Sequence, residues 1–204
     1  MSSKVIGFML ILGPILTMGV WIVYNIDTSG MSPSEAIIAI MADTTKAEIS
    51  SILNVFGVMS MFTGLYFLAK SLKSDNSVSN HFSEIGGLFL LLCIPIWVVM
   101  MGASISAIDS AKEFGNDVGV TIIASSSVLE MGGVLLVVGL FLLGISLTLL
   151  RKYKGIIGIL FIIASVSAFI DMIFQIDILG MIGWMGMFLM TFVTGILTTL
   201  KKEN

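Results

Sequence analysis

The sequence contains very few of the side chains that bind metals, form disulfides or catalyse reactions. Its 204 residues include one cysteine, Cys93, and one histidine, His81. A lone cysteine cannot form a disulfide within the chain, and a lone histidine excludes bis-histidine haem ligation and a His-rich zinc site. Nucleotide-binding glycine loops and Ser-His-Asp or Cys-His catalytic groups are also missing. We therefore expect no cofactor, no metal site and no enzyme activity.

Charge is equally scarce. Only 11% of the residues are charged, whereas 57% are hydrophobic, and the mean hydropathy is +1.09. A soluble domain of this size would lack the polar surface to cover its core. The residues without charge form six runs, most of them close to the roughly 20 residues that cross about 30 Å of hydrocarbon. The sequence thus predicts one all-α domain over residues 1–204, a polytopic membrane protein with six transmembrane helices. The runs cover residues 5–26, 49–69, 85–108, 131–150, 155–170 and 178–200.

The basic residues are distributed unevenly between the two sides of the predicted bundle. One side carries eight of the ten Lys and Arg residues, and the other carries only Lys46 and Lys112. By the positive-inside rule, the side with eight is cytoplasmic. We therefore expect a multi-pass protein of the cell membrane, with both the N- and the C-terminus in the cytoplasm. The eight residues are Lys4, Lys70, Lys73, Arg151, Lys152, Lys154, Lys201 and Lys202.

Acidic residues gather on the opposite, outer side. Their negative potential attracts cations, although the need to keep outer loops soluble would produce the same pattern. These residues are Asp27, Glu35, Asp43, Glu48, Asp109, Glu113, Asp117 and Asp177.

The six runs form pairs with recurring glycines. The spans that start at the cytoplasmic side align at Gly7, Gly87 and Gly158, and the returning spans align at Gly64, Gly139 and Gly195. Small residues let helices approach closely in lipid, where there is no hydrophobic drive for association. The pattern predicts three helical hairpins of common design, unless apolar, Gly-rich spans align by chance.

The loops are short, and two have recognisable features. In the first outer loop, Ser32 and Glu35 fit a capping box with Pro33 at the first helical position. A short amphipathic helix is therefore expected there, on the membrane surface or over the bundle. The linker 71–83 is rich in Ser, Asn and Lys and is expected to be a mobile loop.

Two acidic residues, Glu130 and Asp171, interrupt otherwise apolar helices. Counted along their helices at about 1.5 Å per residue, Glu130 lies roughly 30 Å and Asp171 roughly 24 Å from the cytoplasmic ends. Because no Lys or Arg lies within a span, each carboxylate needs water, a polar cage, a cation or a proton. Ser126, Ser127 and Ser167 lie in the same outer half. We therefore expect a polar pocket of these five residues, open to the outside; the alternative is that they only satisfy one another and the interface.

The chain has three tryptophans, Trp21, Trp97 and Trp184. All of them fall towards the outer ends of their spans, as Tyr24 does. Because indole rings favour the headgroup region, we expect them to be interfacial anchors.

The chain resembles an uncharacterised prokaryotic family of six-helix integral membrane proteins, of the domain-of-unknown-function type. The resemblance rests on the helix count, the capped first outer loop, and two motifs: GLFLLG at residues 139–144 and RKYKGIIG at residues 151–158. It covers most of the chain and implies the six-helix architecture, but no activity.

Two functions follow as expectations. The first is a non-catalytic accessory or interaction subunit, whose partners are the lipid bilayer, other membrane proteins or further copies of the chain, but not nucleic acid. The alternative is a small permease, or an ion- or solute-binding membrane protein with an outward-facing acidic pocket. A membrane enzyme is least favoured. A solvent-connected cavity that reaches Glu130 from outside would favour the alternative.

Overall fold

The computed structural model describes residues 1–24, 26, 28 and 30–200. All regular structure in these residues is helical, and six helical segments are long and apolar enough to cross a membrane. The chain is therefore an all-α, multi-pass membrane protein, as its composition predicts. The helices are α1 (Ser3–Tyr24), α2 (Pro33–Ala42), α3 (Thr44–Lys70), α4 (Ser77–Phe114), α5 (Asn116–Ser126), η1 (Ser127–Met131), α6 (Gly132–Leu149), η2 (Lys152–Gly155), α7 (Ile156–Phe174) and α8 (Asp177–Leu200).

The six spanning segments pack as a closed ring. Helix α1 contacts α3 and α8, and the main contacts continue from α3 through α4, α6 and α7 back to α8. Helices α5, η1 and α6 form one spanning segment, Asn116–Leu149. The ring therefore consists of three antiparallel hairpins, α1–α3, α4–α6 and α7–α8.

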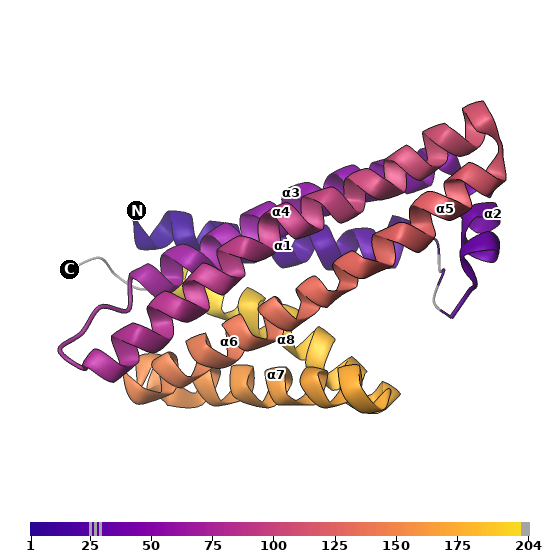
Figure 1. Ribbon diagram of the computed structural model, residues 1–204. Coiled ribbons are helices and arrows are strands. Elements are labelled where there is room, and N and C mark those ends of the chain that lie inside the picture. The colour runs from indigo at the N-terminus through magenta and orange to yellow at the C-terminus, as the bar shows by residue number, and fades with distance from the viewer. Residues whose placement is uncertain (25, 27, 29, 201–204) are drawn as a thin grey trace.

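The two ends of the ring differ in charge. Helix α2 and the α4–α5 turn lie at one end, and the N-terminus lies at the other (Figure 1). We call the end with the N-terminus the basic end and the end with α2 the acidic end. The basic end carries Lys4, Lys70, Lys73, Arg151, Lys152 and Lys154. The acidic end carries Glu35, Asp43, Glu48, Asp109, Glu113, Asp117 and Asp177, as well as Lys46 and Lys112. Asp27, Lys201 and Lys202 lie outside the described residues.

Glycines join neighbouring hairpins near the basic end. A Cβ on Gly7 would lie 2.7 Å from the backbone oxygen of Gly195, and one on Gly87 would lie 2.9 Å from the Cβ of Ala69. A Cβ on Gly158 would lie 2.5 Å from a backbone oxygen of α6. These contacts join α1 to α8, α4 to α3, and α7 to α6. Each aligned glycine of a first helix thus lies against the second helix of the neighbouring hairpin.

The aligned glycines of the second helices fit this pattern less well. Gly64 lies against Leu10 of α1 and Gly139 against Gly86 of α4, each within its own hairpin. Gly195, in contrast, lies against α1 of another hairpin. The three first helices therefore pack alike through their aligned glycines, as the common design predicts. Only two of the three second helices do so.

Helix α2 begins as the capping motif predicts. The Ser32 hydroxyl accepts a hydrogen bond from the Glu35 backbone N–H, and the Glu35 carboxylate accepts one from the Ser32 N–H at 2.8 Å. Ile37 is buried against Ala107 and Ala111 of α4. Helix α4 has 38 residues, a length of about 57 Å, which exceeds the roughly 40–45 Å of a whole bilayer. Helix α2 therefore packs on the projecting end of the α4–α6 hairpin.

The linker 71–83 is not a loop over its whole length, so the prediction of a mobile loop is wrong for its second half. Helix α4 already begins at Ser77, and the Asn76 side chain caps it. The Asn80 amide donates to the Ser74 carbonyl at 2.7 Å and accepts from the Ser74 N–H at 3.0 Å. These bonds fold the polar residues back onto the first turn of α4.

Candidate functional site

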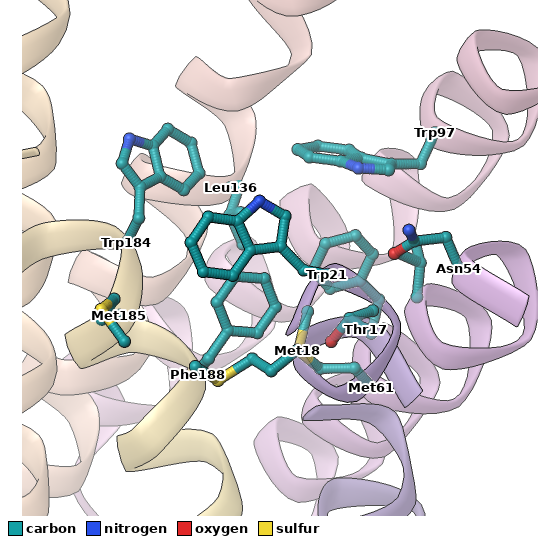
Figure 2. Close-up of a pocket in the computed structure, with 12 residues that line it drawn as sticks. Thr17, Met18, Trp21, Asn54, Met61, Trp97, Leu136, Trp184, Met185 and Phe188 are labelled. Carbon is teal, nitrogen blue, oxygen red and sulfur yellow. The ribbon is translucent and has the colours of Figure 1, made fainter. Parts of the chain in front are cut away.

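A cavity of about 370 Å³ lies inside the ring, in the half nearer the acidic end. Figure 2 shows the residues that line it. We call it the tryptophan chamber, because Trp21, Trp97 and Trp184, the three tryptophans of the chain, all line it. Helices α1, α3, α4, α6 and α8 contribute the wall. Its other residues include Thr17, Asn54, Phe62, Leu136, Met185 and Phe188.

Two of the tryptophans line this chamber from different hairpins. Trp97 comes from α4 and Trp184 from α8 (Figure 2), and both are half-buried. The Trp97 ring also packs edge-on against Phe62, with centroids 5.6 Å apart. The sequence predicts interfacial anchors, and the structure adds that the Trp97 and Trp184 rings are cavity walls. Trp21 is 59% exposed and is both a wall residue and a surface residue.

Asn54 is a chamber residue that the sequence analysis missed. It lies in the middle of α3 and is half-buried. Within the described part of the chain, the structure shows no hydrogen bond from its side-chain amide. An amide in an apolar span without a partner is costly, so water or a bound solute is its natural partner. The signal was present in the sequence, since Asn54 is the one amide side chain in the uncharged run 49–69.

A second cavity, which we call the acidic hollow, adjoins the chamber. Its volume is about 740 Å³, and Glu130, Asp171 and Asp177 line it. Trp97 and Trp184 belong to the walls of both cavities. Glu130 is exposed and Asp171 is half-buried. The hollow therefore brings the two predicted acids to one open site, together with a third acid.

Local backbone structure positions these acids. Glu130 lies on η1, a 3₁₀ segment that interrupts the long span between α5 and α6. Asp177 begins α8 directly after the turn at Gln175, which has a left-handed φ of 52°. Asp171 lies against α8, where a Cβ on Gly180 would be 2.5 Å from the Asp171 Oδ2. A side chain at position 180 would make this carboxylate shift.

Of the three predicted serines, only Ser127 lines the hollow. Its hydroxyl donates to the Ala124 carbonyl at 2.8 Å. Ser126 donates to the Ile123 carbonyl at 2.9 Å and is not part of the cavity wall. Ser167 is buried, with 8% exposure, and is not part of that wall either. The hollow thus contains Glu130, Asp171 and Ser127 of the predicted pocket.

The chamber closes towards the basic end. Beneath it lies a void of only about 10 Å³, whose wall includes Leu65, Leu140 and Thr191. Both leucines are almost completely buried. Further down, the Tyr153 hydroxyl is 2.6 Å from the Thr198 hydroxyl and ties η2 to α8. The cavities are therefore accessible from the half of the ring near the acidic end.

In comparisons with known proteins, no family model, no curated protein and no solved structure matches this chain. The resemblance to a six-helix family therefore stays a prediction from the sequence.

Proposed function

We propose that the protein is a small permease or solute-binding membrane protein, and that the tryptophan chamber is its binding site. The chamber carries this proposal: it is a largely apolar cavity inside a ring of spanning helices, with one amide, Asn54, on its wall. Its volume of about 370 Å³ falls within the usual range for ligand pockets, about 300–1,000 Å³.

The proposal includes an orientation in the cell membrane. With six of the eight described Lys and Arg residues at the basic end, the positive-inside rule makes that end cytoplasmic. The acidic end then faces outward, and solutes enter the hollow from outside. In a Cys93→Ala background, we expect Ser34→Cys to react with an impermeant thiol reagent on intact cells and Asp75→Cys to react only after lysis. The reverse pattern would contradict this orientation.

Intrinsic fluorescence tests the binding site without a label, because all three tryptophans line the chamber. We expect tert-butylbenzene, a compact apolar probe, to change the tryptophan emission of the purified protein saturably. In the Cys93→Ala background, Met185→Cys modified with N-phenylmaleimide should lose this response, since Met185 lines the chamber. Met59→Cys modified in the same way should keep it. Met59 is similarly exposed, 43% against 45%, but is not a chamber residue.

The accessory or interaction subunit expected from the sequence is the alternative outcome. If the probe leaves the tryptophan emission of the wild-type protein unchanged, the chamber is not a binding site. An unchanged response after Met185→Cys modification would likewise show that the probe binds elsewhere. Either result would favour the accessory subunit.

A further inference from the structure

The chamber and the hollow are adjacent. Trp97 and Trp184 are walls of each. On α6 the two cavities are one turn apart, since Gly133 lines the hollow and Leu136 lines the chamber. At Gly133 no side chain intervenes, and a Cβ there would lie 3.4 Å from the Trp184 ring. A molecule that extended from one cavity into the other would lie beside these two indole rings.

The charge of the hollow has a single sign. Glu130, Asp171 and Asp177 line it, and none of its wall residues is Lys or Arg. The ion pair between Lys112 and Glu48 lies elsewhere, on α4 and α3. Low-dielectric walls around uncompensated carboxylates concentrate a negative potential. The hollow therefore favours a cationic group.

The arrangement of the acids argues against a bare metal ion. In the ranges that the structure describes, no three His, Cys, Asp or Glu side chains lie close enough together to hold one. Calcium needs about six to eight oxygen ligands at about 2.3–2.6 Å. An alkylammonium group needs only a nearby negative potential and aromatic faces, of which tryptophan is the strongest. Carboxylates that are too far apart to share a metal ion, next to two indole rings, suit an alkylammonium group.

We infer that the ligand is an amphipathic organic cation, with its apolar body in the tryptophan chamber and its charged group at Trp97 and Trp184, facing the acids of the hollow. This inference rests on the proposed function, because it specifies the ligand of the same chamber. It predicts that the charge of the ligand is recognised separately from its apolar body.

Two isosteric probes separate these contributions. Phenyltrimethylammonium and tert-butylbenzene have the same shape and differ in one atom, a charged nitrogen in place of carbon. In tryptophan-emission titrations, we expect the double substitution Glu130→Gln with Asp171→Asn to weaken binding of the cation about tenfold. The affinity for the neutral probe should stay unchanged. Because each probe is compared between two proteins in the same detergent, partition into micelles cancels.

Controls separate recognition from loss of structure. Glu113→Gln removes an exposed acid of the acidic end that is not in the hollow, and it should leave the affinities for both probes unchanged. If the double substitution lowers the melting temperature, Glu130→Gln alone replaces it, since Glu130 is exposed and the amide keeps its shape. We still expect Glu130→Gln to weaken binding of the cation and to leave the affinity for the neutral probe unchanged.

The outcomes distinguish this inference from the proposed function. If tert-butylbenzene binds and the acid substitutions leave the affinity for the cation unchanged, the inference is wrong while the chamber remains a binding site. The same holds if both probes lose affinity equally. If neither probe changes the tryptophan emission, both the chamber function and the organic-cation ligand are refuted.

Discussion

The basic and acidic halves of the ring are held together differently. Contacts within each hairpin extend along both halves, as at Gly57 against Thr17 and Gly183 against Ala168. The close glycine contacts between hairpins lie near the basic end, where Gly7 meets Gly195 and α6 meets α7. Towards the acidic end, the α7–α8 hairpin diverges from α4 and α5 (Figure 1).

Side-chain hydrogen bonds join helices in both halves. In the acidic half, Lys112 of α4 donates to Glu48 of α3 at 2.8 Å. In the basic half, the buried hydroxyls of Ser79 and Ser146 are 2.9 Å apart and link α4 to α6. In the acidic half, the hydroxyls of Ser126 and Ser127 bond to carbonyls of their own segment. The basic half is closely packed by its glycine contacts, while the acidic half consists of hairpins around two cavities. The comparison teaches that a membrane bundle can be closely packed at one end and retain cavities at the other.

The largest effect on stability is expected from a substitution at a glycine contact of the basic half. In Gly158→Ala, the new methyl group would lie 2.5 Å from a backbone oxygen of α6, so α6 and α7 must separate. We expect a loss of about 1–3 kcal/mol in the free energy of unfolding, typical of overpacking. Thermal melting of the detergent-solubilised protein measures it.

Gly102→Ala is the matched control, because a Cβ on Gly102 has no atom within 4 Å. Alanine favours the helix by up to about 1 kcal/mol over glycine, so this substitution should stabilise the protein. Equal effects of the two substitutions would contradict the distinction between a packed and an open region.

The sequence predicted the fold well because lipid imposes simple rules on it. Spans must be long and apolar, so the six helices could be counted from the charge-free runs. The capping box at Ser32 and Glu35 is a local pattern and was confirmed. The ring could not be predicted, because an apolar span does not reveal which helix its glycines contact. Gly195 shows this, since it aligns with Gly139 and yet packs on another hairpin.

An intermediate effect is expected for buried polar groups. Ser146→Ala removes the side-chain partner of Ser79 in the packed half, and should cost about 1 kcal/mol of unfolding free energy. Asn54→Leu breaks no hydrogen bond that the structure shows in the described residues, and it makes the chamber wall more apolar. We expect this variant to melt at or above the wild-type temperature. A larger loss for Asn54→Leu than for Ser146→Ala would show that the amide stabilises the fold.

The candidate site was predictable only in part. An acid in an apolar run is conspicuous, so Glu130 and Asp171 were found, and both line the hollow. Ser126 and Ser167 lie in the predicted outer half of their spans but do not line the hollow. Depth in the membrane does not determine which face of a helix a residue occupies. The chamber was missed because tryptophan is equally at home in the headgroup region and in a cavity.

The smallest expected effect is at α2, on the projecting end of the acidic half. The Ser32 hydroxyl and backbone N–H both donate to the Glu35 carboxylate, and these bonds lower the pKa of Glu35 from its usual value of 4.5. A lowered pKa in the folded state means that the ionised carboxylate stabilises the cap. This contribution is fully present above about pH 4.5 and is lost as the pH falls through the lowered value.

Hydrogen exchange of the α2 amides can detect this contribution, because it reports local opening of the helix. After correction for the intrinsic effect of pH on exchange, we expect wild-type protection of α2 to be constant at neutral pH and to fall in acid. Glu35→Gln should show weaker protection at neutral pH and lose this acid dependence, while the spanning helices keep their protection. Ser34→Ala changes a neighbouring side chain outside the capping box and should follow the wild type. If Glu35→Gln follows it as well, the carboxylate does not hold α2 in place, and the contact of Ile37 with Ala107 and Ala111 is sufficient.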